Sequence, residues 1–255
     1  MHTPSRIPAA VWWITALNIA LVMLYTIVLP TYRAPDEPEH FDLVRYVATA
    51  REYPAFDGLS LNEQTVESLW TTRLGRKHLD TSDIADRDAR STFDELAADV
   101  QSEVPNRMPQ HPPAYYGLMG LVYGLLSFVG LERASYDVVV MVTRASNVIF
   151  AAAIPVLAYL TTVRLSRNRM AGIAAAAVPL AIPQLIHIQG SVNNDNLWIL
   201  LASLTTYFVA RVLRGDITSR TALMLGLLVG LSLFTKAFAL VMPLWIAILY
   251  LIVWR

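Results

Sequence analysis

Long apolar runs without charged residues alternate with short polar connections over most of the chain. The first run, residues 11–30, contains 20 residues and no charge, enough for one helix to cross about 30 Å of hydrocarbon. Arg6 precedes this run and no small-residue cleavage site follows it, so we expect an uncleaved transmembrane helix rather than a signal peptide. The pattern predicts an all-α fold, a polytopic transmembrane helix bundle that forms a single membrane domain over residues 1–255. The later apolar runs are residues 113–131, 138–163, 171–188, 197–212, 221–235 and 238–254.

The charged residues are concentrated in one stretch between the first two apolar runs. Residues 31–111 hold 16 of the 20 acidic and 9 of the 20 basic side chains, a local net charge of −7. Only 16% of the whole chain is charged, against about a quarter in soluble domains. This distribution predicts a large acidic loop outside the membrane, with short helices at 63–74 and 92–104. A net charge of zero argues against nucleic-acid binding, and the absence of cysteine excludes disulfides and thiolate metal sites.

Basic residues in the short connections indicate which helix ends face the cytoplasm, since cytoplasmic loops are enriched in Lys and Arg. If the runs at 113–131 and 138–163 both cross the membrane, the cluster that follows them falls on the outer side, against the rule. If only one crosses, every cluster falls inside. We therefore favour six crossings, with 113–131 as an interfacial or re-entrant segment and 31–111 outside; seven crossings are the alternative. The clusters are Arg164, Arg167 and Arg169; Arg211, Arg214 and Arg220; and Arg255.

The outer loop opens with three acids and a histidine directly after the first apolar run, at Asp36, Glu37, Glu39 and His40. Asp36 and Glu39 have the spacing of a helix capping box, with Pro38 in the first turn, so a short surface helix is predicted to begin here. Capping is one interpretation of these acids. The other is that a carboxylate at the membrane surface acts as a general base toward an acceptor, with Asp36 as the first candidate and Glu37 as the second. His40 is predicted to line the same substrate cavity.

The loop ends at a second cluster of candidate residues. His111 precedes two prolines, which hold its backbone extended, and Tyr115 follows at a level that suits lipid headgroups. These residues are either an aromatic anchor or a wall of the substrate cavity. Within the loop, four aspartates lack the glycine turn and terminal glutamate of a calcium site, so we expect a solvated face and no metal or other cofactor. They are Asp80, Asp83, Asp86 and Asp88.

Few polar groups interrupt the later apolar runs, and such groups are functional candidates in a membrane. Arg144, within residues 138–163, either snorkels to the interface or binds a lipid phosphate through its planar fork. Lys236 is either an interfacial anchor or a counter-charge for a phosphate. Asn194 and Asp195 either form a polar turn that caps the next helix or line the substrate cavity, with Asp195 facing the outer-loop base.

Several of these motifs follow one another in a distinctive order. They are Asp36-Glu37, His111-Pro-Pro-x-Tyr-Tyr, the helix with Arg144, residues 193–196 and Gly230-Leu-Ser-Leu-Phe-Thr-Lys236. In this order they resemble the membrane glycosyltransferases of the GT-C superfamily, in particular the branch of protein O-mannosyltransferases and aminoarabinose transferases. The chain looks like the N-terminal module of such enzymes, and we expect the C-terminal half of a full-length relative to be missing.

The resemblance implies that a polyprenyl-phosphate-linked sugar is the donor, that Asp36 is the catalytic base and that transfer inverts the anomeric carbon. Arg144 and Lys236 would neutralise the charge of the leaving phosphate. Asn196 stands where oligosaccharyltransferase relatives have a glutamate, which argues against a metal. We expect an integral protein of the bacterial inner membrane, acting on a lipid, glycan or protein acceptor. The alternatives are a transporter or flippase component and a non-catalytic membrane subunit or fragment.

Overall fold

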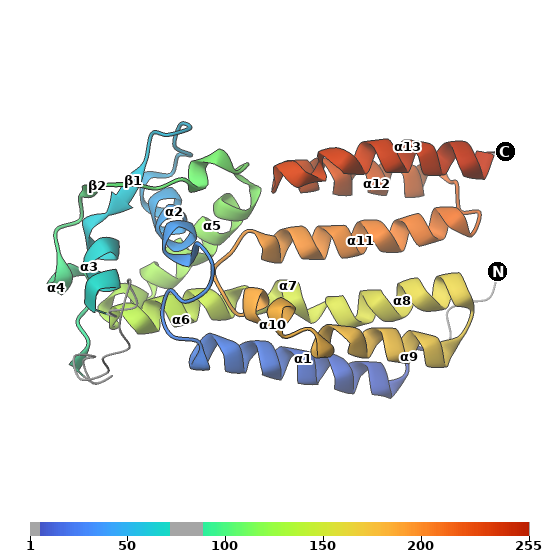
Figure 1. Ribbon diagram of the computed structural model, residues 1–255, viewed down its shortest axis with the longest axis horizontal. Helices are drawn as coiled ribbons and strands as arrows, with labels where there is room; N and C mark the ends of the chain where they lie inside the picture. The colour runs from blue at the N-terminus through green and yellow to red at the C-terminus, as the bar shows by residue number, and fades with distance from the viewer. Residues whose placement is uncertain (1–5, 72–88, 255) are drawn as a thin grey trace. The chain divides into compact units, whose positions relative to one another are not determined.

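Helices follow the apolar runs of the sequence and account for nearly all the regular structure. The computed structural model describes residues 6–71 and 89–254 (Figure 1), so the four loop aspartates considered as a metal site lie outside the described residues. Within these ranges the strands are β1 (Ser60–Asn62) and β2 (Gln101–Pro105), which pair antiparallel. The predicted all-α fold class is confirmed.

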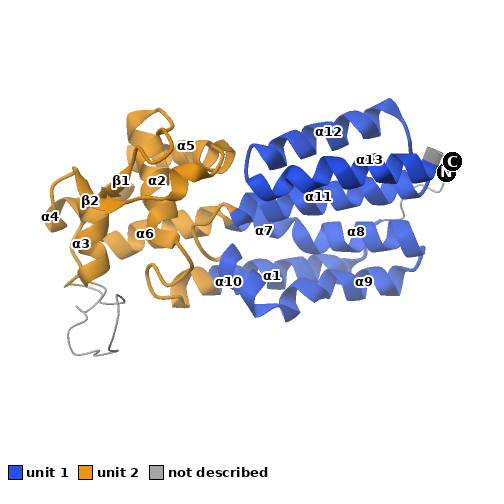
Figure 2. Cartoon of the chain, turned by 45° about the horizontal axis from the view of Figure 1, so that its top comes forward, with its two compact units in different colours: residues 1–24, 148–189, 195–255 blue, residues 25–147, 190–194 orange. Residues whose placement is uncertain are grey.

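The chain divides into two compact units, coloured separately in Figure 2. Unit 1 comprises Met1–Leu24, Val148–Gln189 and Asp195–Arg255, and unit 2 comprises Tyr25–Asn147 and Gly190–Asn194. Unit 1 therefore takes most of the apolar runs, and unit 2 takes the acidic loop. Whether both units act as one membrane domain stays a prediction.

Unit 1 is made of helices that lie along one another (Figure 2). The first, α1, begins and ends close to the predicted bounds, because an uncharged apolar run of this length has no internal signal that would end a helix. In chain order the unit contains α1 (Ala9–Val28), α7 (Val148–Ala152), α8 (Ile154–Ser166), α9 (Arg169–Ala177), η5 (Val178–Ala181), α10 (Pro183–Gln189), α11 (Asp195–Leu213), α12 (Ser219–Leu233), η6 (Ala237–Leu240) and α13 (Val241–Trp254).

Three helical stretches among the described residues are long and apolar enough to cross a membrane: Ala9–Val28, Tyr136–Ser166 and Asp195–Leu213. A fourth span results if Arg169–Ala181 and Pro183–Gln189, which are bent by 70°, count as one. The remaining apolar helices of the described residues contain only 10–17 residues, so the predicted number of six crossings stays a prediction.

The basic connections of unit 1 lie at one end of its helices. The α8–α9 and α11–α12 connections gather there in Figure 2. Arg164 of the first connection lies 4.0 Å from the Asp216 carboxylate of the second, which also accepts a 2.8 Å hydrogen bond from Arg211 Nε. Clustering of the basic residues at one end is the arrangement that the positive-inside argument requires.

The stretch Tyr136–Ser166 contains Arg144, as predicted. Its 31 residues correspond to about 46 Å of helix, more than the roughly 30 Å of hydrocarbon that one span crosses. The helix is broken after α6 (Tyr136–Ser146), and the residues from Val148 onward belong to unit 1 again. Arg144 therefore belongs to the unit that contains the acidic loop and not to the apolar unit.

Unit 2 consists of short elements around α2 (Glu37–Ala50), the helix predicted to begin at Asp36. The predicted helix 63–74 corresponds to α3 (Glu63–Thr71), but the predicted helix 92–104 is wrong. Its first residues form α4 (Phe93–Leu96), and β2 replaces the rest because it pairs with β1. The other elements are η3 (Met108–Gln110), α5 (Ala114–Phe128), η4 (Leu131–Arg133) and α6.

Helix α5 packs closely on α2. A Cβ added at Gly120 would lie 3.0 Å from Val47 Cγ1, so a larger residue would push the Val47 side chain aside by a few tenths of an ångström. The buried face of α5 carries Tyr115 and Tyr123, whereas Leu121 and Phe128 are exposed. With 15 residues, or about 22 Å of helix, α5 is shorter than one span, in line with our interfacial interpretation.

Candidate functional site

The start of α2 borders a cavity of about 530 Å³. Asp36 and Glu39 line it from the first turn of the helix, and Arg107 lines it from the segment that joins β2 to η3. Two carboxylates and a guanidinium thus share one cavity wall. Its other lining residues are Val104, Pro105, Met108 and Gln110.

Asp36 occupies the N-cap position but does not cap the helix. Its backbone is left-handed (φ 54°, ψ 20°), and its side chain makes no capping hydrogen bond. The capping interpretation of Asp36 is therefore wrong. A left-handed backbone costs a non-glycine residue about 1–3 kcal/mol, and such strain is concentrated at functional sites. The exposed carboxylate of Asp36 is left available to a ligand in the cavity.

Glu39 is the second carboxylate of this cavity. The sequence pattern alone suggested only a capping role for Glu39. Burial raises the pKa of Glu39, the charges of Asp36 and Asp42 add to that rise, and Arg107 opposes it. The i, i+3 spacing of Asp36 and Glu39 was the signal that placed both on one helix face. Arg107 carried no such signal, since its position depends on how β2 returns toward α2.

Replacing Glu39 with glutamine should stabilise the protein, and by more as the pH rises. The pKa of Glu39 is higher in the folded chain than in the unfolded chain. The stability linked to its bound proton is therefore present below the unfolded pKa and lost as the pH rises through the folded pKa. Glutamine does not ionise and loses nothing over this range. Thermal unfolding of both proteins between about pH 4 and pH 8 measures the difference.

The matched control for this measurement is Glu103→Gln, which removes an exposed carboxylate from β2. Its unfolding temperature relative to the wild type should be nearly independent of pH. A constant difference between Glu39→Gln and the wild type would show that the Glu39 carboxylate does not lose stability on ionisation.

Glu37 and Arg144 form a buried ion pair. Arg144 Nε donates to Glu37 Oε1 at 2.7 Å and Arg144 Nη2 to Glu37 Oε2 at 2.5 Å. The exposed fractions of the two side chains are 0% for Glu37 and 2% for Arg144. Each member of this pair therefore has its charge balanced inside unit 2.

Further hydrogen bonds connect the Glu37–Arg144 pair to two other segments. Arg144 donates to the carbonyls of Leu29 at 2.6 Å and Pro30 at 2.9 Å, just after α1. The backbone N–H of Val192 donates to Glu37 Oε1 at 3.0 Å. The pair thus ties the residues after α1, the start of α2, α6 and residues 190–194 together, directly beside Asp36.

The aromatic residues that we expected in the substrate cavity form a stacked cluster between α2 and α5. His40 Nδ1 lies 2.8 Å from the Tyr116 hydroxyl, and the His40 ring stacks on His111 at 6.1 Å between centroids. Tyr115 is buried, and its hydroxyl donates to Asn147 Oδ1 at 2.9 Å. These contacts hold α5 against α2. A direct contact of His40, His111 or Tyr115 with substrate stays a prediction.

The last group of expected site residues divides between the units. Asp195 and Lys236 form an ion pair in unit 1, between the first residue of α11 and the residue before η6. Asn194 belongs to unit 2 and is buried, and neither polar atom of its amide has a hydrogen-bond partner among the described residues. The structure thus pairs Lys236 with an acid. That Asp195 faces Asp36 stays a prediction.

Comparison with protein families gives a match to one of them. A model of the dolichyl-phosphate-mannose-protein mannosyltransferase family matches residues 111–255. The chain belongs to this family. No curated protein and no solved structure matches the chain. The family match confirms the GT-C resemblance and identifies the chain as a membrane glycosyltransferase of the GT-C type.

The matched segment contains Arg144, Asp195 and Lys236 but begins after the residues that line the Asp36 cavity. The family therefore establishes the class of enzyme, and the role of Asp36 depends on the geometry of unit 2. Among the described residues, no group of three or more histidine or acidic side chains is arranged to hold a metal ion.

Proposed function

We propose that the chain transfers a sugar from a polyprenyl-phosphate donor to an acceptor hydroxyl on the outer face of the membrane, with Asp36 as the general base. The observation that carries this proposal is the carboxylate of Asp36. It is exposed, lines a 530 Å³ cavity and makes no capping bond. A base must reach the proton that it removes before its pKa matters. Of the two predicted bases, Asp36 lines the cavity and Glu37 is buried.

In the proposed reaction Asp36 takes the proton of the acceptor hydroxyl while that oxygen bonds to the anomeric carbon of the sugar. The bond between the anomeric carbon and the phosphate oxygen breaks, and its electron pair leaves with the polyprenyl phosphate. The transition state is oxocarbenium-like, and attack opposite the phosphate inverts the anomeric carbon. A phosphate leaves as an anion, so the step needs no general acid.

One cation of the cavity is proposed to favour the anionic donor, because Arg107 adds positive charge to the wall beside Asp36. Lys236 belongs to unit 1, and its phosphate role stays a prediction. Its ammonium has three donors, of which Asp195 occupies one. Glu39, whose pKa is raised by burial, donates a hydrogen bond to a ligand hydroxyl when it is protonated.

Glu37 and Arg144 receive a different role in this proposal. Every nitrogen of Arg144 already donates to Glu37 or to a backbone carbonyl. We therefore assign the pair to positioning Asp36, rather than to base catalysis by Glu37 or phosphate binding by Arg144. A charge that is neutralised by its buried partner has little left to offer a donor phosphate.

The donor class can be tested with purified protein and radiolabelled donors. Polyprenyl-phosphate mannose should lose its sugar to an acceptor or to water in the presence of the protein, whereas guanosine-diphosphate mannose should remain intact. The reason is that the proposed reaction releases a lipid phosphate from the outer boundary of the bilayer. Consumption of the nucleotide sugar with no turnover of the lipid-linked sugar would overturn the proposed donor.

We also propose that the acidic unit faces the outside of a bacterial inner membrane. Single cysteines at Ser166, in the basic connection of unit 1, and at Glu103, on β2, should then react with a membrane-impermeant thiol reagent from opposite sides. Both positions are exposed, and the chain contains no other cysteine. Labelling of both from the same side of sealed vesicles would contradict this orientation.

A further inference from the structure

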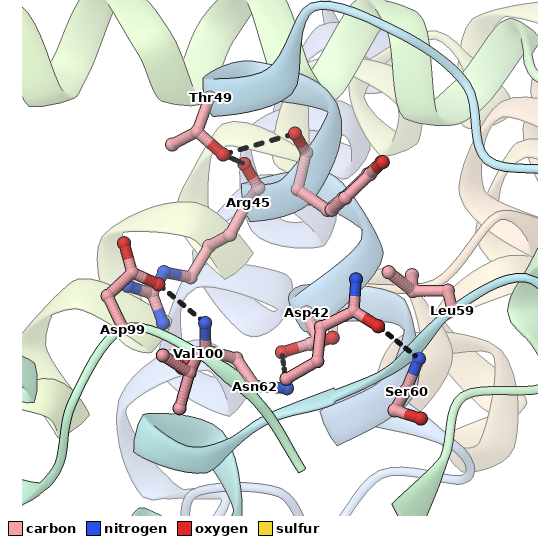
Figure 3. Close-up of a pocket in the computed structure, with 10 residues that line it drawn as sticks. Asp42, Arg45, Thr49, Leu59, Ser60, Asn62, Asp99 and Val100 are labelled. Atoms are coloured by element: carbon pink, nitrogen blue, oxygen red, sulfur yellow. Dashed lines mark hydrogen bonds between the residues drawn. The ribbon is translucent and has the colours of Figure 1, made fainter.

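A second, smaller cavity of about 200 Å³ lies further along the same helix (Figure 3). Asp42, Arg45 and Thr49 line it from α2, and Asn62 lines it from β1. Asp99 and Gln101 complete its wall from the residues at the start of β2. None of these residues takes part in the proposed transfer step.

The same helix and the same strand pass both cavities. Asp42 and Arg45 lie on later turns of α2 than Asp36 and Glu39 and face another side of the helix, because each step of three residues turns it by about 300° rather than a full 360°. The rise from Asp36 to Arg45 is about 13 Å. On β2, Gln101 lines the smaller cavity and Pro105 the larger, again about 13 Å apart. An extended molecule that follows β2 could therefore reach both cavities.

The carboxylate of Asp42 connects α2 to the segments at β1 and after β2. Its Oδ1 accepts from Asn62 N at 3.0 Å and Thr65 Oγ1 at 2.8 Å, and its Oδ2 accepts from Asn106 Nδ2 at 3.2 Å. Asn106 is the neighbour of Arg107, which lines the larger cavity. Asp42 thus has its hydrogen bonds within unit 2 and fixes the two strands against α2, while the other polar groups of the wall face the smaller cavity.

The remaining wall offers both donors and acceptors. Asp99 uses one oxygen, Oδ1, to accept from Asn62 Nδ2 at 2.6 Å, and Gln101 Oε1 accepts weakly from Ser60 N at 3.4 Å. Arg45 donates from Nη2 to Gln64 at 2.8 Å, but its Nε and Nη1 are buried without a hydrogen-bond partner among the described residues. The accessible part of the wall therefore retains a carboxylate oxygen of Asp99 and the amide N–H₂ of Gln101.

This combination fits a neutral ligand with several hydroxyl groups. A hydroxyl can donate to Asp99 and also accept from the amide of Gln101. A phosphate would meet the carboxylates of Asp42 and Asp99 beside a single guanidinium, and an ammonium would meet Arg45. A bound peptide would pair with a strand edge and insert side chains into apolar pockets, whereas this cavity is lined mainly by polar side chains.

We propose that the smaller cavity is a distal acceptor subsite that binds a sugar unit of a glycan acceptor while the reacting hydroxyl lies at Asp36. This inference rests on the proposed function, since it needs Asp36 to mark the reacting end. It narrows the acceptor from any hydroxyl compound to an oligosaccharide chain longer than one unit, because a single unit does not reach both cavities.

Binding of mannobiose to the full-length chain in detergent, followed by saturation-transfer NMR, tests the subsite without requiring turnover. The wild type should bind the disaccharide saturably. Asp99→Asn and Gln101→Ala should each weaken binding about tenfold, as expected for loss of one good hydrogen bond. Both side chains are exposed at the cavity rim, so folding should be preserved. Glu103→Gln is the matched control, because it removes a carboxylate from the same strand outside the lining, and it should bind like the wild type.

Two further measurements separate this inference from the proposed function. Asp36→Asn should bind mannobiose normally even though it transfers sugar about 10²–10⁴-fold more slowly; if its transfer rate is close to that of the wild type, the proposed base fails while the subsite stands. A serine- and threonine-containing hexapeptide should not compete with the disaccharide. Competition by the peptide, absence of saturable disaccharide binding, or equal affinity in the wild type, Asp99→Asn and Gln101→Ala would each overturn the subsite.

Discussion

Replacing Asp36 with asparagine should lower the rate of sugar transfer by about 10²–10⁴-fold, the usual contribution of a general base. Donor binding should remain largely intact, because the base acts on the acceptor proton and the donor is held through its phosphate and lipid. Asparagine tolerates a left-handed backbone as well as aspartate does, so the φ of 54° at this position is no obstacle to folding. Initial rates with polyprenyl-phosphate mannose and separate donor-binding titrations measure the two effects.

Asp57→Asn is the matched control for this experiment. Asp57 is also exposed, belongs to unit 2 and has a left-handed backbone with φ 56°, but it does not line the cavity of Asp36. Its transfer rate should equal that of the wild type. Near-normal turnover by Asp36→Asn would remove Asp36 from catalysis, and Glu39 would become the first carboxylate to test in the same cavity.

Removing one member of the Glu37–Arg144 pair should destabilise the fold by about 3–5 kcal/mol, the cost of leaving a buried charge without its partner. Arg144→Met leaves Glu37 buried beside Val192, and Glu37→Gln leaves the guanidinium beside the carbonyls of Leu29 and Pro30. Because each variant loses the same interaction, the double variant should cost less than the sum of the two. Unfolding temperatures in detergent, compared across all four proteins, give the coupling.

Arg164→Met is the control for the loss of an arginine as such. Arg164 is 43% exposed and lies 4.0 Å from Asp216, so its contribution should be no more than about 1 kcal/mol. Donor titrations then separate the two roles considered for Arg144. If Arg144 held the donor phosphate, folded Arg144→Lys would lose donor affinity and folded Glu37→Gln would not. The positioning role predicts that both variants lose stability and keep donor affinity once folded.

The sequence by itself determined the helices and the class of the protein. Apolar runs and capping residues determine where a helix begins and ends through residues close in sequence, because each backbone hydrogen bond of a helix joins residues four positions apart. The bounds of α1 and the start of α2 were therefore predictable from local pattern. Charge segregation separated the acidic loop from the apolar runs for the same reason, since composition is a local property. The order of the short motifs sufficed for the GT-C resemblance, which the family match confirms.

The tertiary structure alone decided what the acids of the outer loop do. Glu37 pairs with a residue 107 positions away, and β2 replaces a predicted helix by pairing with a strand some forty residues earlier. The left-handed backbone of Asp36, which frees its carboxylate from capping, also had no signal in the residue pattern. Burial and ion pairing depend on which segments come into contact in the folded chain. The local pattern of apolar and polar residues does not show which distant segments these are. The three neighbouring acids Asp36, Glu37 and Glu39 thus received different surroundings only when the chain folded.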